Sequence, residues 1–413
     1  MFTIGYYDDS AGHGGTTQYL VELLSALDRR RFRPVVFSPS PASWHDGVRE
    51  LGAEVVTGPP GPRPPSTAAP HDPAMPIRPV AAVRPSAIAA LRRTVGWHRG
   101  LRREIASLAA LFRRHPVDLL HSNNVGEEVA PIAARAAALR RVVGTLHVDP
   151  SYDLLGAHDA PRHRTLQRRS LAALDLAIAV SASTAAMWRA HLGLRPDDPP
   201  PMVVIPNGIR IARLVRRQDT AAAKAALGIP ATDLVIGSVG RLDYAKGYAD
   251  LLEALPAVLA AVPQARLVHA GRGPLDEALQ REAERLGIAD RITWLGFRAD
   301  VRDLLEAAEV YVQPSWCEAQ GLGVLEAAAL EVPVVAAAVG GLPETLADGE
   351  AGWLVRPRDP AALAASLVDA LQHPDRRRHH AAALLTRLHQ HYTQDHMVTN
   401  TMAQYDRLLA EAA

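Results

Sequence analysis

The sequence predicts an α/β protein of two doubly wound domains, each a mostly parallel sheet with helices on both faces. Apolar runs of about four to seven residues alternate with amphipathic stretches of about ten or more, which is the pattern of repeated strand–helix units. The pattern occurs twice, on either side of a proline-rich break at 195–208 that cannot continue a helix. At 413 residues, the chain is long enough for two domains of ordinary size.

The predicted elements follow one another in a similar order in both halves. In the first half the strands are FTIGYY, RPVVFSP, AEVVTG, VDLLHSN, RVVGTLH and LAIAVSA, and the helices span 16–28, 101–114, 126–138 and 161–173. In the second half the strands are LVIGSVGR, ARLVHAG, ITWLG, VYVQPS, VPVVAAA and AGWLV, and the helices span 247–261, 275–286, 300–308, 322–330 and 360–371. Ligands of such sheets bind at the carboxyl ends of the strands, so functional residues are expected there, facing a cleft between the domains.

The predicted domains are 1–200 and 201–387, and a C-terminal helix at about 388–413 is expected to pack back on the first domain. The proline-rich segment 58–79 predicts a surface loop or lid with polyproline character. Three arginines recur every eleven residues after it and fall on one helix face: Arg92, Arg103 and Arg114. Gly96 and Gly100 are expected to break this helix. The arginine face is either simply solvated or, together with the 58–85 loop, binds an anionic lipid surface or an anionic acceptor.

Composition excludes several classes of protein. The formal net charge is +1, from 45 basic and 44 acidic side chains, which argues against a dedicated nucleic-acid binder. The single cysteine, Cys317, excludes an intramolecular disulfide and a multi-cysteine metal site. The N-terminus lacks the features of a signal peptide, and no apolar run approaches the ~20 residues of a membrane span. A cytoplasmic protein is therefore expected, with peripheral contact at the inner membrane face as an alternative.

Two glycine-containing loops are candidates for binding phosphate. The loop GHGGTT, 12–17, opens the first helix, and its backbone N–H groups are suited to an anion; the alternative is a tight turn capped by Thr16. In GSVGRLDYAKG, 237–247, Arg241 and Lys246 lie five residues apart between a strand and a helix, as a diphosphate site requires. The alternative for this second loop is that both cations are solvated, with Arg241 paired to Asp243.

The sequence also argues against other chemistries. No Asp-x-Asp pair occurs, and the histidines, including His147 at a predicted strand end, form no metal-ligand cluster. No metal or other cofactor is therefore expected, and Arg241 and Lys246 would have to neutralise a diphosphate themselves. The nucleophile elbow GxSxG and the phosphate loop GxxxxGK[ST] are both absent. Cys317 has no basic neighbour that would make it a nucleophile.

The stretch EAQGLGVLE, 318–326, contains two glutamates that cannot share a small target on one continuous helix, because eight residues climb about 12 Å. If the helix begins between them, near Gly321, then Glu318 lies in the loop after a strand and Glu326 lies two turns into the helix. An extended ligand could then contact both carboxylates.

Taken together, these pieces resemble the retaining nucleotide-sugar glycosyltransferases of family 4, which have the two-domain GT-B fold. The motifs occur in the order of that family: GG at 14–15, His147 after a strand, VIPNGI at 204–209, VGRLDYAKG at 239–247, AGRGP at 270–274, WLGF at 294–297, the two glutamates of 318–326, VPVVAAAVGGLPE at 332–344 and GWLVRPRDP at 352–360. The resemblance spans nearly the whole chain, and its second half is the more specific.

The resemblance implies a role for each matching residue. The donor diphosphate would be bound by Gly14, Gly15, Gly240, Arg241 and Lys246. The base would lie against Gly296, Phe297 and Arg298, and the ribose would bind Glu326. The transferred sugar would contact Glu318, the turn formed by Ala319, Gln320, Gly321, Leu322 and Gly323, and His147. The acceptor, a glycan, lipid or small natural product with a hydroxyl group, would bind near His13, Asn124 and His147. Arg241, Lys246, Glu318 and His147 would be the catalytic residues.

The chain departs from the family pattern in three places. Ala319 and Gln320 replace the Gly-Phe pair that usually follows the first glutamate, so the donor-sugar preference is expected to differ. Arg210 stands where an acidic residue is usual, and so does Arg272 in AGRGP.

The resemblance implies metal-independent transfer of a sugar from a nucleoside diphosphate, UDP in the first place and GDP in the second, with attack on the same face. A covalent glycosyl intermediate on Glu318 is the rival mechanism. A nucleotide-sugar epimerase and a non-catalytic sugar-nucleotide-binding protein are the rival functions.

Overall fold

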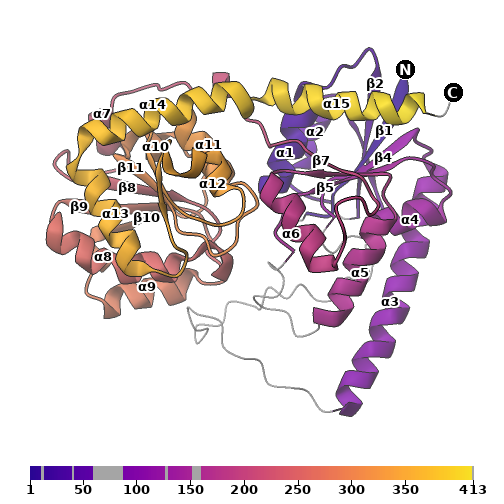
Figure 1. The fold of residues 1–413 in the computed structure, drawn as a ribbon, viewed down its shortest axis with the longest axis horizontal. Helices are drawn as coiled ribbons and strands as arrows, with labels where there is room; N and C mark the ends of the chain where they lie inside the picture. The colour runs from indigo at the N-terminus through magenta and orange to yellow at the C-terminus, as the bar shows by residue number, and fades with distance from the viewer. Residues whose placement is uncertain (11–13, 40, 59–86, 126–128, 151–159, 412–413) are drawn as a thin grey trace. The chain divides into compact units, whose positions relative to one another are not determined.

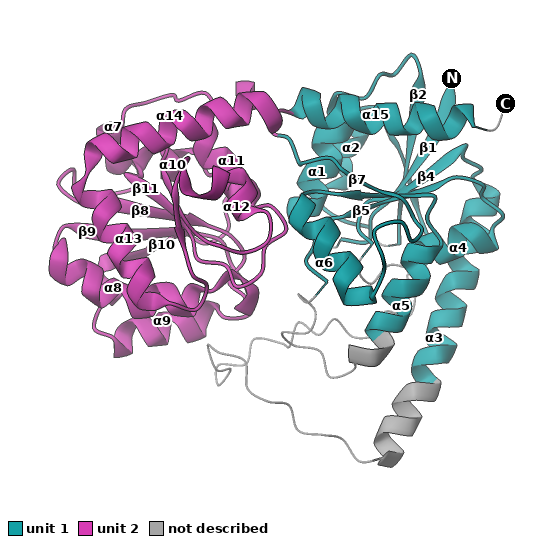
Figure 2. Cartoon of the chain, in the orientation of Figure 1, with its two compact units in different colours: residues 1–67, 81–208, 394–413 teal, residues 68–80, 209–393 magenta. Residues whose placement is uncertain are grey.

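The computed structural model describes residues 1–10, 14–39, 41–58, 87–125, 129–150 and 160–411, with the backbone alone for 87–95 and 160–162. The chain divides into two compact units (Figure 2). The described residues up to Gly208 and those from Gln394 onwards form the first unit, and Ile209–Thr393 lie in the second. The boundary therefore falls eight residues after the predicted one at 200/201, and the C-terminal helix joins the first unit from residue 394 rather than 388.

The first unit is built on a seven-stranded parallel sheet in the order β3-β2-β1-β4-β5-β6-β7. Its strands are β1 Phe2–Tyr7, β2 Phe32–Ser38, β3 Glu54–Thr57, β4 Leu119–Ser122, β5 Val142–Leu146, β6 Leu176–Ala179 and β7 Met202–Val204. Six of these were predicted. The edge strand β7 was missed because its three residues lie within the proline-rich break, and prolines are tolerated only at a sheet edge.

Helices lie on both faces of this sheet (Figure 1), as a parallel sheet requires. They are α1 Gly15–Ser25, α2 His45–Glu50, α3 Ala87–Arg114, α4 Ala130–Ala136, α5 Ala160–Ala172, α6 Ala182–Leu192 and α15 Gln394–Ala410. The C-terminal helix α15 packs beside α1 and is fixed by buried polar contacts. Tyr405 Oη lies 2.6 Å from His121 Nδ1, and Gln394 Nε2 donates to Glu22 Oε2 over 2.6 Å.

Helix α3 corrects one prediction, because Gly96 and Gly100 do not break it: the helix runs unbroken from Ala87 to Arg114. A glycine inside a helix costs about 1 kcal/mol relative to alanine. The apolar face offsets this cost by packing on the sheet, where Leu108 and Phe112 are buried. Arg103 and Arg114 lie on the exposed face, as predicted. The side chain of Arg92 is not among those described, and residues 59–85 of the predicted loop lie outside the described residues.

The second unit is built on a six-stranded parallel sheet in the order β10-β9-β8-β11-β12-β13. The strands are β8 Leu234–Val239, β9 Ala265–Ala270, β10 Ile292–Trp294, β11 Val310–Gln313, β12 Val334–Ala337 and β13 Trp353–Val355, and all six were predicted. The helices are α7 Thr220–Ala226, α8 Tyr248–Ala261, α9 Asp276–Arg285, α10 Arg302–Ala307, α11 Leu322–Ala329, α12 Leu342–Thr345, α13 Pro360–Gln372 and α14 Pro374–His391. The predicted class, two doubly wound α/β domains, is confirmed.

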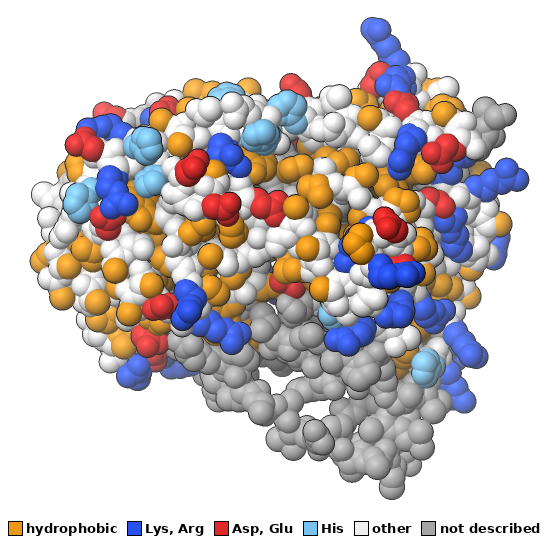
Figure 3. Space-filling view, in the orientation of Figure 1, with side chains coloured by type: hydrophobic (Ala, Val, Ile, Leu, Met, Phe, Trp, Pro, Cys, Tyr) orange, Lys and Arg blue, Asp and Glu red, His pale blue; other side chains and the backbone are white. Residues whose placement is uncertain are grey.

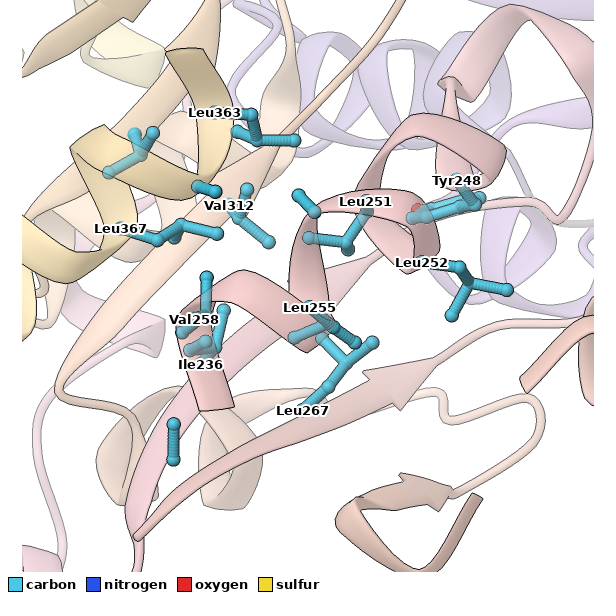
Figure 4. Close-up of a cluster of buried hydrophobic side chains, with 14 of the residues drawn as sticks. Ile236, Tyr248, Leu251, Leu252, Leu255, Val258, Leu267, Val312, Leu363 and Leu367 are labelled. Atoms are coloured by element: carbon cyan, nitrogen blue, oxygen red, sulfur yellow. The ribbon is translucent and has the colours of Figure 1, made fainter. Parts of the chain in front are cut away.

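One of the two apolar cores of the second unit lies between its sheet and helices α8 and α13, and the other lies on the opposite face of the sheet, against α10, α11 and α14. Figure 4 shows Leu251 and Leu255 of α8 and Leu367 of α13 turned toward Ile236 and Val312 of the sheet. All five side chains are fully buried, and burial of one such side chain contributes about 2 kcal/mol. This packing fixes β8 and β11 side by side, and the loops after these two strands carry most of the predicted donor site.

Within the described residues, no helix combines the length and apolar character needed to cross a membrane. On the face drawn in Figure 3, basic side chains gather over the part of the first unit formed by α3 and α4. The exposed arginines of α3 include Arg99, Arg102, Arg103, Arg113 and Arg114.

Candidate active site

The predicted donor residues of the second unit meet where β8 and β11 end. The two strands are adjacent and parallel, with Tyr311 paired to Gly237, so their carboxyl ends share one edge of the sheet. The loop after β8 carries Arg241 and Lys246, and the loop after β11 carries Glu318. Residues that are far apart in the sequence are thus neighbours at this edge, as doubly wound sheets bring ligand-binding loops together.

Lys246 and Glu318 form an ion pair at this edge. Lys246 Nζ lies 2.6 Å from Glu318 Oε2, and the side chains are only 22% and 12% exposed. Burial acts to lower the pKa of Lys246, but the Glu318 carboxylate outweighs it by charge and hydrogen bond, and the pKa is raised overall. The ammonium group is therefore charged at physiological pH and already points to the glutamate predicted to contact the sugar.

Two further donors reach the same carboxylate oxygen. Gln313 Nε2 lies 3.1 Å and Ser315 Oγ 3.2 Å from Glu318 Oε2. Among the described residues, Oε1 of Glu318 accepts no hydrogen bond. One carboxylate oxygen is thus held by the protein, and the other is left for a ligand.

Arg241 lies on the same loop as Lys246 but does not contact Glu318. Its Nε donates to Asp243 Oδ2 over 2.7 Å, and its side chain is 60% exposed. The pairing with Asp243 considered from the sequence therefore exists in the structure. The Asp243 side chain is only 8% exposed, so it holds the arginine stem at the loop while the guanidinium remains accessible.

Two left-handed glycines allow the site loops to approach each other closely. At Gly247, φ is +67°, and a Cβ atom would lie 2.0 Å from Pro314 O. At Gly340, φ is +54°, and a Cβ atom would lie 1.4 Å from Glu318 O. No residue with a side chain fits at either position without moving the backbone. These contacts fix the Glu318 loop from both sides.

Trp316 also links the loops. Its backbone N–H donates to Ala245 O over 2.7 Å, and its indole N–H donates to the buried Asp250. The guanidinium of Arg358 lies 4.7 Å from the centre of the Trp316 ring, in a cation–π contact. The sequence analysis assigned no role to Trp316 or Arg358.

Helix α11 begins at Leu322 with Gly321 as its N-cap, so its start lies between the two glutamates, as predicted. Glu318 therefore lies in the loop before the helix, and Glu326 lies on the helix, partly buried. The pKa of the Tyr311 phenol is raised well above its usual value by burial first, then by Tyr248 and by the carboxylates of Glu326 and Glu318. The Tyr311 phenol therefore lies close enough to both glutamates for their charges to raise its pKa.

The segment predicted to lie against the base follows β10. Phe297 is 59% exposed, Arg298 is exposed, and Gly296 has a φ of +67°. A Cβ atom on Gly296 would lie 3.1 Å from the guanidinium of Arg272, so the unusual arginine of AGRGP lies against this segment. Ala319 and Gln320, which replace the usual Gly-Phe pair of the family, are both buried, with 5% and 2% of their surface exposed.

In the first unit, His147 follows β5 and is packed edge-on against Tyr19, with 4.5 Å between ring centres. Its pKa is lowered to about 3 by burial and by His121, so the imidazole is neutral at physiological pH. His147 Nε2 is buried and has no hydrogen-bond partner among the described residues. Asn124 Oδ1 is likewise buried and unpaired within the part of the chain described. His13 lies outside the described residues.

The loop before α1 differs from its prediction in one detail. Thr17, not Thr16, makes the capping contacts, with its Oγ1 accepting from Gly14 N over 2.8 Å and donating to Gly14 O over 2.9 Å. The Gly14 amide, assigned to the diphosphate by resemblance, is therefore occupied by Thr17 in this structure. Gly15 is the first residue of the helix.

Several residues at the strand ends of the two units were not predicted from the sequence. In the first unit, the buried Asp8 accepts a hydrogen bond from Asn123 Nδ2 over 2.6 Å, and the same nitrogen donates to Thr16 O. In the second unit, Gln313 and Ser315 hold Glu318. The signal for Gln313 was present, because a polar residue interrupts an otherwise apolar strand in VYVQP. Over the described ranges, no group of three or more His, Cys, Asp or Glu side chains is arranged to hold a metal ion.

Comparison with known proteins places the chain in a family. The family described as Glycosyltransferase Family 4 matches residues 13–213, and the family described as Glycosyl transferases group 1 matches residues 219–383. Among solved structures, that of Anabaena Alr3699/HepE in complex with UDP and glucose shares the fold, with a TM-score of 0.74 at 22% identity over 98% of this chain and 100% of that one. Sucrose-phosphate synthase from Thermosynechococcus elongatus has a TM-score of 0.76 at 21% identity over both full chains.

Two relatives of known name are also glycosyltransferases. The D-inositol 3-phosphate glycosyltransferase of Segniliparus rotundus is 37% identical over 187 residues, which are 44% of this chain and only 41% of the relative. The chain thus matches less than half the length of that enzyme. The 2-deoxystreptamine N-acetyl-D-glucosaminyltransferase of Streptomyces fradiae is 31% identical over 302 residues, 70% of this chain and 71% of the relative. The chain therefore belongs to glycosyltransferase family 4, with the GT-B fold.

Proposed function

We propose that this protein is a retaining glycosyltransferase that moves a sugar from a nucleoside diphosphate, UDP in the first place, to a hydroxyl group of a small acceptor, without a divalent metal ion. The observation that carries the proposal is the Lys246–Glu318 ion pair at the shared edge of β8 and β11. It puts a cation suited to a diphosphate beside a carboxylate suited to sugar hydroxyls.

The cations of the β8 loop would bind the diphosphate. An ammonium group has three N–H donors, and Lys246 uses one of them on Glu318, so two remain for phosphate oxygens. Arg241 keeps an exposed guanidinium on the same loop. As the glycosidic bond breaks, negative charge grows on the leaving diphosphate, and preorganised cations stabilise such charge most effectively. This is the role that a metal ion has in enzymes with an Asp-x-Asp pair.

The hydrogen bonds of Glu318 favour sugar positioning over a covalent intermediate. A carboxylate that accepts three hydrogen bonds, one from an ammonium group, is a weak nucleophile because its negative charge is largely compensated. Oε1 remains able to accept a hydrogen bond from a sugar hydroxyl. We therefore propose same-face attack, in which the acceptor oxygen bonds to the anomeric carbon while the leaving diphosphate takes its proton.

The first unit would contribute the acceptor contacts. Asn123 uses its amide N–H groups on Asp8 and Thr16, which leaves its buried Oδ1 unpaired within the described residues, like Asn124 Oδ1 and His147 Nε2. Buried acceptor atoms without partners are costly unless a ligand supplies donors. Hydroxyl groups of an acceptor or of the transferred sugar would satisfy them, and the neutral imidazole of His147 can either donate or accept.

The comparisons support the choice of substrates. The Anabaena protein of similar fold was solved with UDP and glucose, which supports a UDP donor. The two relatives are named for small acceptors, D-inositol 3-phosphate and 2-deoxystreptamine, which favours a small-molecule acceptor over a lipid or a glycan.

Donor turnover tests the proposal. The protein, treated with EDTA, is incubated with a panel of UDP- and GDP-sugars, with and without polyol and aminocyclitol acceptors, and products are followed by proton NMR. We expect slow hydrolysis of an α-linked donor to release the α-anomer first, and faster turnover when a suitable acceptor is added. Release of the β-anomer would contradict retention, an isomerised donor would identify an epimerase, and complete loss of turnover in EDTA would contradict metal independence.

A further inference from the structure

The carboxylate of Glu318 is held by a network of hydrogen bonds among buried side chains of β11 and the loop after it. Gln313 is 3% exposed, and Ser315 and Tyr311 are fully buried. Gln313 Nε2 donates to Ser315 Oγ over 2.7 Å and to Glu318 Oε2 over 3.1 Å. Tyr311 Oη donates to Gln313 Oε1 over 2.7 Å. Every polar atom of the Gln313 side chain is therefore used.

The orientation of the Gln313 amide follows from its neighbours. Glu318 Oε2 can only accept, so the group facing it must be the NH₂ and not the carbonyl. Reversal of the amide would place a carbonyl oxygen against a carboxylate oxygen, and neither could donate a hydrogen bond. The contact with Glu318 thus fixes the orientation of the amide.

Tyr311 extends the chain toward the second glutamate. A Cβ atom on Gly323, in the first turn of α11, would lie 2.2 Å from Tyr311 Oη, so the phenol lies directly beneath the start of the helix that carries Glu326. The hydroxyl also lies 3.2 Å from Val239 O, at the end of β8. One buried hydroxyl thus contacts the strand before the cation loop, the amide that holds Glu318 and the start of α11.

The filling of space alone does not explain a buried amide at position 313. Burying a polar group costs free energy that its hydrogen bonds at best recover, and a leucine or methionine would fill a similar volume at no such cost. A fully satisfied buried network instead fixes one geometry. The network ends on Glu318, which is predicted to touch the transferred sugar.

We propose that Gln313 is a positioning residue for sugar transfer. Together with Ser315 and Lys246, it keeps Oε2 of Glu318 turned to the protein, so that Oε1 is presented to the donor sugar. The inference rests on the proposed function for the identity of the ligand, but the contact itself is a property of the protein without ligand. The role is specific: Gln313 acts on the sugar through Glu318 and does not touch the nucleotide.

The first test separates sugar from nucleotide. We replace Gln313 by Met, which keeps a similar volume and removes all three hydrogen bonds of the side chain. UDP affinity is measured by calorimetry, and kcat/KM is measured with the best UDP-sugar. We expect kcat/KM to fall by about 10- to 100-fold, the range for loss of a charge-assisted hydrogen bond, while the Kd of UDP changes less than about twofold. Ser315→Ala should show the same split with a smaller loss.

The matched control is Gln280→Met on α9. Gln280 Nε2 donates to a carboxylate oxygen as well, that of Asp276, over 2.7 Å, but Gln280 lies on the exposed surface. This variant should keep the wild-type kcat/KM. Equal values for Gln313→Met and wild type would overturn the proposal, and so would a parallel loss of UDP affinity and kcat/KM, which would indicate a general structural role.

The second test needs no substrate. Thermal unfolding is compared for Gln313→Met, Glu318→Leu and the double variant. If the two side chains interact as described, the shifts in Tm are not additive, because the second substitution removes a partner that the first has already lost. Additive shifts would overturn the proposal even if the protein is a transferase. Non-additive shifts in a protein that fails to bind any nucleoside diphosphate would leave the contact standing and would refute the proposed function instead.

Discussion

The ammonium group of Lys246 and the carboxylate of Glu318 lie 2.6 Å apart, although 72 residues separate them in the chain. The pair exists because β8 and β11 are neighbours in the sheet and because Gly247 lets the β8 loop approach the β11 loop closely. It joins the group expected to bind the diphosphate to the group expected to bind the sugar.

Replacement of Lys246 by Ala should weaken UDP binding by about 1.5 to 3 kcal/mol, the value of a charge-assisted hydrogen bond, and should lower kcat further because charge grows on the leaving group. Lys246→Arg should restore part of the binding but less of the turnover, because a planar guanidinium cannot replace an ammonium group 2.6 Å from Glu318 without moving it. Calorimetry and donor turnover measure the two effects. Wild-type turnover in Lys246→Ala would refute the assignment.

Glu326→Ala should weaken UDP binding by about 1–3 kcal/mol, because the carboxylate is expected to accept hydrogen bonds from the ribose hydroxyls. The partner group can be removed as well. For 2′,3′-dideoxyuridine diphosphate, which lacks these hydroxyls, wild type and Glu326→Ala should bind with equal affinity. An unchanged affinity of the variant for UDP itself would remove Glu326 from the site.

Gly340→Ala should reduce donor turnover, whereas Gly287→Ala should not. Both glycines have left-handed backbone angles, with φ of +54° and +68°, so both variants bear a similar strain of about 1 kcal/mol. Only at Gly340 would the new Cβ atom meet Glu318 O, at 1.4 Å, whereas nothing lies within 4 Å at Gly287. Thermal unfolding and kcat/KM should separate the two variants. An equal effect of both on kcat/KM would mean that the contact with Glu318 has no part in the site.

Stability should fall as the pH decreases below about 6.5. The pKa values of His121, His147 and His269 are each lowered to about 3, mainly by burial. Between about pH 6.5 and pH 3 the unfolded chain binds protons that the folded chain does not, and each such group costs up to about 1.4 kcal/mol per pH unit. Above pH 6.5 these groups add no pH dependence. The loss is therefore on the acid side only.

His147→Gln tests one of these groups, through the slope of Tm against pH between about pH 6.5 and pH 4. The slope should be shallower in the variant, by less than one full group because His147 is partly exposed. A slope identical to that of wild type would mean that the imidazole of His147 is protonated in the folded protein.

Much of the fold could be predicted from the sequence. The apolar runs located twelve of the strands because parallel strands buried on both faces stay apolar along their whole length. The three-residue strand β7 was missed, since so short a run among prolines has no periodicity. The predicted helix break at Gly96 and Gly100 was wrong, because the low helix propensity of glycine is a weak signal once a helix has a packed apolar face.

The candidate site could be predicted only in part. Glu318, Glu326 and Lys246 carry charge in recognisable motifs, and the helix start at Leu322 followed from Gly321. The partners of Glu318 could not be deduced, because the sequence gives neither the register of β8 against β11 nor the direction of the Gln313 amide. Those depend on tertiary packing, as does the close approach of Gly340 to the Glu318 carbonyl.

In the proposed function, the edge formed by β8 and β11 binds the donor diphosphate through Lys246. The chain has two lysines, which makes a direct test practical. Lys224 is 5% exposed and paired with Glu309, whereas Lys246 belongs to the proposed site. Biosynthetic labelling with [¹⁵Nζ]lysine leaves the three N–H donors of each ammonium group unmodified and should give one NMR signal for each lysine, assigned with Lys246→Arg. On titration with UDP we predict a saturable shift of the Lys246 signal and none of the Lys224 signal. An unmoved Lys246 signal at UDP concentrations that saturate binding by calorimetry would show that Lys246 does not bind the diphosphate.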